Sequence, residues 1–155
     1  MIARYNPDMT QIDRSALLPY PQADMYSLVA DIECYPEFLE GCEGAEIIAA
    51  EDRSVTARLD LARAGIHHSF TTRNLMTPHA QIELTLVDGP FERFAGIWRF
   101  TALGENACKV TLSLDFQLRS GLVQAAIGKL FDKVALDLVD AVVRRATTLY
   151  GSDPQ

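Results

Sequence analysis

The chain has 155 residues, 48% of them hydrophobic and 23% charged, and its 21 acidic and 14 basic residues give a net charge of −7. This length and composition are typical of one globular domain and exclude an intrinsically disordered chain. The acidic excess disfavours a general binder of nucleic-acid backbones, which depends on lysines and arginines. No apolar run approaches the roughly 18 residues of a transmembrane helix.

The ends of the chain carry little pattern. We expect a single domain over residues 9–150, with 1–8 and 151–155 as flexible termini. The first residues lack the apolar segment of a signal peptide. A cytoplasmic protein is therefore expected.

Three cysteines are present without a CxxC pair: Cys34, Cys42 and Cys108. An odd number at this spacing indicates free thiols in a reducing compartment. A metal site made by Cys34 and Cys42 with His67 and His68 is a minor alternative, because no segment holds a short pair of ligands. We expect no metal.

Hydrophobic periodicity defines the first elements. Alternating apolar and polar residues predict a strand over 10–18, and helical spacing after Pro21 predicts a helix over 22–32. The stretch CYPEFLEGC, 34–42, predicts a second short helix or turn that ends at Gly41.

From residue 45 the hydrophobic period changes to two. This predicts six successive strands, over 45–52, 54–65, 66–77, 81–88, 92–103 and 108–118. Their short connections require antiparallel neighbours.

A helical period then runs from 120 to 150, with Ser120 as the expected N-cap. Helices segregated from an antiparallel sheet make the fold α+β. A seven-stranded sheet must twist, so we expect it to curl around the long terminal helix and to leave a cavity between sheet and helix.

Four stretches carry a family resemblance: YPEFLEGC, FTTRN, LVDGPFERFAGIWRF and RATTLY. With this order of elements, residues 9–150 resemble the coenzyme Q-binding and RatA (ribosome association toxin) family of START-like proteins in the polyketide cyclase/dehydrase superfamily. The resemblance implies a helix-grip fold with a hydrophobic tunnel under the C-terminal helix. It also implies two lines of function, which are polyprenyl-quinone binding in support of respiration and association with the large ribosomal subunit that blocks subunit joining.

The strand ERFAGIWRF places Phe94, Gly96, Trp98 and Phe100 on one face. Its arginines mark the opposite face as the wetter one, so the aromatics should face the helix. Gly96 leaves a gap between them, and Phe91 should lie at the rim. These aromatics either line a cavity or form an ordinary core, and we weigh the two interpretations equally.

We expect twelve residues to contact a ligand: Tyr35, Phe38, His68, Phe70, Phe91, Phe94, Trp98, Phe100, Phe116, Phe131, Leu138 and Arg145. The strand phase turns His68 inward and His67 outward. Arg145 falls on the apolar stripe of the terminal helix. There it is either a cation at a helix C-terminus or a donor to a quinone carbonyl.

No GxSxG, HExxH, P-loop or GxGxxG motif is present, and we expect no enzyme activity. A cyclase or dehydratase would need an acid–base group in the cavity, and His68 is its best candidate. We expect ubiquinone or a related polyprenyl lipid as a bound ligand and not as a catalytic cofactor, with transient contact to a quinone enzyme or to the inner membrane face. A RatA-like ribosome binder is the alternative that the net charge disfavours, and DNA is not expected.

The terminal helix also contains Gly121 and Gly128, seven residues apart. An interior glycine costs about 1 kcal/mol relative to alanine. Residues 120–128 are therefore expected either to pack closely against a bulky neighbour or to form a weak lid that admits a lipid.

Overall fold

The computed structural model describes residues 9–119 and 124–151. The expected Ser120 cap, Gly121 and the segments 1–8 and 152–155 lie outside the described residues. The described elements follow one another as β1 (Thr10–Leu18), α1 (Gln22–Ala30), the 3-10 helix η1 (Ile32–Glu37), β2 (Cys42–Glu51), β3 (Ser54–Arg63), β4 (Ile66–Thr77), β5 (Gln81–Asp88), β6 (Phe91–Gly104), β7 (Ala107–Leu118) and α2 (Gln124–Tyr150).

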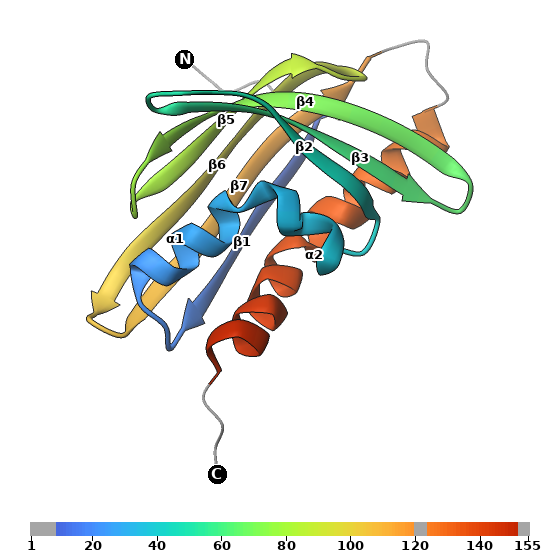
Figure 1. Ribbon diagram of the computed structural model, residues 1–155. Helices are drawn as coiled ribbons and strands as arrows, with labels where there is room; N and C mark the ends of the chain where they lie inside the picture. The colour runs from blue at the N-terminus through green and yellow to red at the C-terminus, as the bar shows by residue number, and fades with distance from the viewer. Residues whose placement is uncertain (1–8, 120–123, 152–155) are drawn as a thin grey trace, which may run out of the picture.

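The strands form one antiparallel sheet with the order β1-β7-β6-β5-β4-β3-β2. Strands β2 to β7 are consecutive hairpins, and β1 adds to the far side of β7, where Thr10 pairs with Phe116 and Leu18 with Cys108. The sheet curves over α2, with α1 and η1 between β1 and β2 in the chain (Figure 1). The predicted α+β class and helix-grip arrangement are confirmed.

The core lies between the sheet and α2. In β7 every second residue from Cys108 to Phe116 is buried, as a strand with one covered face requires. Leu130, Val142 and Ala146 supply the matching face of α2 and are at most 1% exposed. Burial of such side chains contributes about 1.5 to 3 kcal/mol each for the larger ones.

The segment between β1 and β2 departs from its prediction. The helix expected over 22–32 ends at Ala30, because Asp31 takes the non-helical angles φ −84° and ψ 70°. A 3-10 helix then starts at Ile32 and includes Pro36. Gly41 ends this segment as predicted, with a φ of +94° that favours glycine. A Cβ at Gly41 would lie 2.9 Å from Val134 Cγ2, so this turn packs directly on α2.

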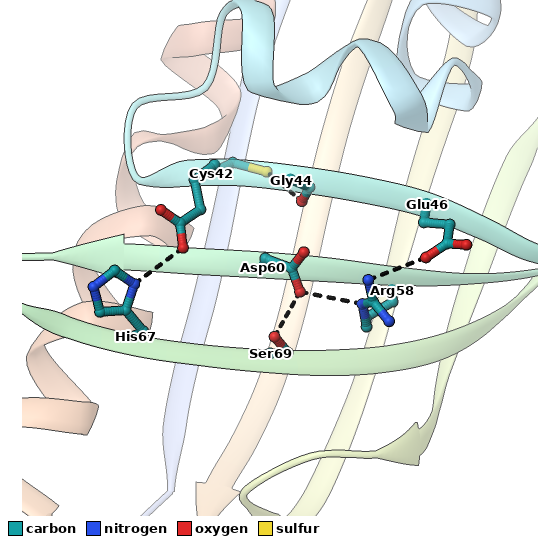
Figure 2. A network of polar contacts seen from close by, with 8 residues as sticks. Cys42, Gly44, Glu46, Arg58, Asp60, His67 and Ser69 are labelled. Carbon is teal, nitrogen blue, oxygen red and sulfur yellow. Dashed lines mark hydrogen bonds and ion pairs between the residues drawn. The ribbon is translucent and has the colours of Figure 1, made fainter.

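The outer face of β2, β3 and β4 carries a polar network (Figure 2). Asp60 Oδ1 accepts hydrogen bonds from Ser69 Oγ at 2.5 Å and from Arg58 Nε at 3.2 Å. Arg58 Nη2 also lies 3.0 Å from Glu46 Oε1. Gly44 makes room for the carboxylate, because a Cβ there would be 2.6 Å from Asp60 Oδ2. These groups point away from α2 and do not take part in the cavity described next.

Candidate ligand cavity

A cavity of about 90 Å³ lies between the sheet and α2. When the open space between this cavity and the solvent is included, the empty volume is about 770 Å³. Its walls come from η1, β3 to β7 and α2. The lining side chains are apolar except for Tyr35, Thr72 and Asn74. Eight of the twelve residues expected to contact a ligand line this cavity: Tyr35, Phe70, Phe91, Phe94, Trp98, Phe116, Phe131 and Leu138. Whether they bind a ligand stays a prediction.

Five phenylalanines form one end of the cavity, and Phe91 is at their centre. Its ring centroid lies 4.7 Å from that of Phe131, 5.1 Å from Phe94, 5.6 Å from Phe116 and 5.7 Å from Phe70. Most of these pairs are tilted or edge-to-face, which is the favourable geometry for aromatic rings. The three strands and the helix that carry these rings, β4, β6, β7 and α2, are thereby joined around one apolar end.

An irregularity in β6 brings Phe91 into this cluster. Regular alternation would put Phe91 on the face opposite Phe94, and we expected it at the rim. The β6–β7 register shifts between Phe91 and Arg93, and such a bulge re-aims the side chain beside it. Phe91 is consequently 3% exposed and lies deep in the wall.

Gly96 does not leave an empty gap. A Cβ at Gly96 would lie 2.5 Å from Leu114 Cδ2 and 3.1 Å from Leu84 Cδ1. The two leucine side chains therefore lean into the space that the glycine provides, and both line the cavity. The expected inward face of Phe94, Gly96, Trp98 and Phe100 is otherwise as predicted, since Gly96, Trp98 and Phe100 are all buried.

Trp98 also lines the cavity, and Phe100 stacks on it without lining the cavity. The Trp98 and Phe100 rings are stacked, 6.3 Å apart and 11° from parallel. Phe100 packs edge-to-face on Tyr26 of α1, 5.6 Å away, and its carbonyl accepts a hydrogen bond from Gln22 Nε2 at 2.7 Å. Phe100 does not line the cavity, because α1 covers that end of the sheet.

Tyr35 presents its ring to the cavity while its hydroxyl is already bonded. Tyr35 Oη donates to the Val29 carbonyl at 2.6 Å, and burial raises the pKa of this tyrosine well above its usual value. Phe38 packs against Tyr35 with ring centroids 5.6 Å apart. Phe38 is half-buried outside the cavity, since η1 turns it toward α2.

Arg145 does not reach the cavity. Its Nη2 lies 2.9 Å from Glu37 Oε1, and its guanidinium lies 5.4 Å from the centroid of the Phe38 ring. The helical phase places Arg145 on the apolar stripe of α2, and the contacts with Glu37 and Phe38 hold its side chain against the segment that follows α1. Arg145 does not line the cavity, so the expected contact between Arg145 and a ligand is not made by this geometry.

The two histidines of β4 point in opposite directions, as predicted. His67 Nδ1 lies 3.0 Å from Glu43 Oε2 on the outer face (Figure 2). The His68 ring is on the helix side, 6.3 Å from the Phe131 ring. It stands behind Phe131 and does not line the cavity, so the expected contact between His68 and a ligand is not made by this geometry.

Two polar residues of the cavity lining, Thr72 and Asn74, are not among the residues predicted from the sequence. Both belong to the inward face of β4 and are 8% and 5% exposed. Thr72 Oγ1 donates to Asn74 Oδ1 at 2.7 Å. The signal was their position two and four residues after Phe70, which places them on the same face in FTTRN.

The cysteines make local contacts. Cys34 Sγ donates to Asp31 Oδ2 at 3.0 Å, and this bond is the main cause that raises the pKa of Cys34 to about 11. Burial raises the pKa of Cys42 to about 11. Within residues 9–119 and 124–151, no group of three or more potential ligands lies close enough to hold a metal ion, and no helix there is long and apolar enough to cross a membrane.

Comparison with known proteins identifies the family. Residues 18–143 match the family of polyketide cyclase/dehydrase and lipid transport proteins. The chain is 45% identical to the ribosome association toxin RatA of Pseudomonas aeruginosa over 92% of this chain and 99% of that protein. It is also 22% identical to the mitochondrial coenzyme Q-binding protein COQ10 homolog B of Xenopus laevis, over 91% of this chain and 59% of that one.

Among solved structures, the Zhui aromatase/cyclase from Streptomyces sp. R1128 superposes with a TM-score of 0.78 at 17% identity, over 93% of this chain and 98% of that one. At this identity the likeness concerns the fold alone. A START superfamily protein from Mycobacterium smegmatis has a TM-score of 0.75 at 22% identity, over 90% and 98% of the two chains. The chain thus belongs to the polyketide cyclase/dehydrase and lipid transport family, as a START-like protein similar to RatA.

Proposed function

We propose that this protein binds an apolar ring-bearing lipid, of the prenylated quinone class, in the cavity between the sheet and α2. The observation that carries the proposal is the cavity itself, whose aromatic lining includes five phenylalanines and Trp98. Such walls suit a flat ring, because aromatic groups stack or meet edge-to-face with extra stabilisation of about 0.5 to 1.5 kcal/mol per pair. The similarity to a coenzyme Q-binding protein supports the same ligand class.

The size of the cavity says how such a ligand would fit. An apolar cavity of about 150 Å³ holds benzene, so the 90 Å³ present here is too small for a substituted quinone ring without outward movement of the walls. An isoprene unit, with five carbons at about 0.8 kcal/mol per buried methylene, contributes roughly 3 to 4 kcal/mol when buried. The ring enters the cavity, and most of a long tail stays outside it, on a membrane face or in a partner protein.

No catalytic step is part of this proposal. The ligand is carried and not used as a cofactor, because the lining offers only Tyr35, Thr72 and Asn74 as polar side chains. The test uses Trp98, the single tryptophan of the chain, whose fluorescence a bound quinone quenches. Titration with a short-chain ubiquinone should quench it saturably at one ligand per chain. Quenching that rises linearly, as it does for free tryptophan in the same buffer, would refute the proposal.

Ribosome association is the second candidate, and the 45% identity to a protein named ribosome association toxin favours it. The net charge of −7 opposes contact with ribosomal RNA. Co-sedimentation with purified large ribosomal subunits tests whether the protein binds them in spite of its net negative charge. The measurement is made at about 0.15 M salt, where charges are screened over roughly 8 Å. Stoichiometric sedimentation would establish this candidate. Its absence would leave the lipid-binding proposal intact.

A further inference from the structure

The amide of Asn74 is held from one side only. Thr72 Oγ1 donates to Asn74 Oδ1 at 2.7 Å and so turns the amide nitrogen away from Thr72. Among the described residues, Nδ2 has no hydrogen-bond partner, although Asn74 is 95% buried and lines the cavity. Nδ2 is not completely buried, because the one fully buried side-chain nitrogen or oxygen without a partner among the described residues is Asp132 Oδ1. The surface that Nδ2 keeps faces the cavity that Asn74 lines, and a donor that faces an apolar cavity without an acceptor calls for an explanation.

The neighbours of Asn74 leave it accessible from the cavity. In the sheet register Asn74 pairs with Leu84 of β5, and Leu84 pairs with Gly96 of β6. Leu84 Cδ1 lies only 3.1 Å from where a Cβ of Gly96 would be, so the Leu84 side chain leans toward Gly96 and away from Asn74. On the β3 side Asn74 pairs with Val55, and Thr72 pairs with the small Ala57, which itself lines the cavity.

We propose that Asn74 recognises the polar end of the ligand by donating a hydrogen bond to an oxygen of carbonyl type, with Thr72 as the residue that positions the amide. This inference rests on the proposed function and adds the chemistry of the ligand's buried end. The free group is a donor, so its partner must accept. The remaining walls are apolar, so the rest of the buried ligand must be hydrocarbon-like or aromatic. A quinone carbonyl on a methylated ring has both properties.

The test compares two ring compounds of nearly the same shape. Duroquinone carries two carbonyl oxygens, and durene is the tetramethylbenzene without them. Their affinities for the full chain are measured by ligand-detected nuclear magnetic resonance. The wild type should bind duroquinone at least tenfold more tightly than durene. Asn74→Leu should lower duroquinone affinity about tenfold and leave durene affinity unchanged.

Two further variants keep the result interpretable if Asn74→Leu folds poorly. Thr72→Val with Asn74→Leu removes both partners, which is often nearly neutral for stability, and it should show the same selective loss. Thr72→Val alone should lose part of the duroquinone affinity, because the amide is no longer oriented. Thr85→Val, which removes an exposed hydroxyl from the outer face of β5, is the matched control and should change neither affinity.

The outcomes separate this inference from the proposed function. Equal affinity for both compounds in the wild type, unchanged in the variants, overturns the role of Asn74 and keeps the cavity as a binding site. Equal losses for both compounds in Asn74→Leu reduce Asn74 to a structural residue. A wild type that binds neither compound overturns the proposed function together with this inference.

Discussion

Arg145 Nη2 of α2 lies 2.9 Å from Glu37 Oε1 of η1. The Arg145 side chain is 20% exposed and that of Glu37 is 61% exposed. Ile32 and Tyr35 of η1 and Leu138 of α2 line the cavity. The ion pair therefore joins the two helical segments that border the cavity on one side.

Arg145→Ala should destabilise the protein more than Glu37→Gln does. The ion pair alone is worth at most about 1 kcal/mol because Glu37 is largely solvated, whereas Arg145 also covers the Phe38 ring. Both variants should release a bound quinone faster in stopped-flow displacement. Equal effects of the two substitutions on thermal unfolding would show that the contact with Phe38 contributes nothing.

Trp98 and Phe100 provide a matched pair of substitutions. Both are 2% exposed, yet only Trp98 lines the cavity. Each alanine variant should lose about 3 to 5 kcal/mol of unfolding free energy if its site does not collapse. Calorimetric titration should show weaker quinone binding for Trp98→Ala and little change for folded Phe100→Ala. A folded Trp98→Ala protein with wild-type affinity would remove Trp98 from the binding site.

Gly96→Ala should reduce the cavity although Gly96 itself is not one of its lining residues. The added methyl displaces the ends of the Leu84 and Leu114 side chains, and such overpacking costs about 1 to 3 kcal/mol. The displaced side chains move toward Asn74 and the ring site, so quinone affinity should fall. An alanine variant that is destabilised but binds as the wild type does would mean that the leucines move elsewhere.

Gly128→Ala tests whether the start of α2 acts as a lid. A Cβ at Gly128 would lie 3.5 Å from Leu118 Cδ1, an ordinary contact, so alanine fits and adds up to about 1 kcal/mol of helix stability. Amide exchange should be faster over 124–128 than over 134–142, and quinone should slow it. The variant should admit quinone more slowly. Uniform exchange along α2, with and without quinone, would make Gly128 a packing residue.

Asp132 should make stability depend on pH. Its Oδ1 is buried without a hydrogen-bond partner among the described residues, and burial raises the pKa of this carboxyl, with a smaller opposite effect of Thr10. A raised folded-state pKa means that the folded protein binds more protons, so this contribution to stability is present below the unfolded pKa near 3.8 and is lost as pH rises through the folded pKa.

Asp132→Asn should therefore stabilise the protein at pH 7, and its advantage should shrink as the pH falls toward 4. Denaturant unfolding at several pH values measures this difference. The exposed Asp140→Asn on the same helix is the control. If the free energy of unfolding of Asp132→Asn differed from that of the wild type by the same amount at every pH, Asp132 would not have a raised pKa in the folded protein.

Most strands of this fold are predictable from sequence because one of their faces is covered and the other is wet, as in β7. Strand β2 differs, because its residues 46–51 are exposed on both faces. The period of two between residues 45 and 119 predicts every strand to within a few residues, and the helical stripe predicts α2. Where a residue depends on a partner far along the chain, the pattern is not sufficient. The helical pattern places Arg145 on the apolar stripe of α2, but it does not reveal the ion pair of Arg145 with Glu37.

The cavity was foreseeable in outline only. Alternation puts Trp98 and Phe94 on the inner face, but it cannot show the bulge that brings in Phe91, because it assumes regular pairing. It also cannot show that α1 covers Phe100. Thr72 and Asn74 share the inward face of Phe70, yet an inward polar residue is usually bonded within the core, and only the structure shows an amide with a free donor.

Mass spectrometry of a lipid extract, made from the protein purified out of its own host, shows whether the protein carries a prenylated quinone. The wild type should carry a prenylated quinone at close to one molecule per chain. Ala135→Phe, which fills the cavity from α2, should lose it, and Leu136→Phe at the exposed neighbouring position should keep it. A wild type that carries no more prenylated quinone than the folded Ala135→Phe variant would contradict quinone binding in this cavity.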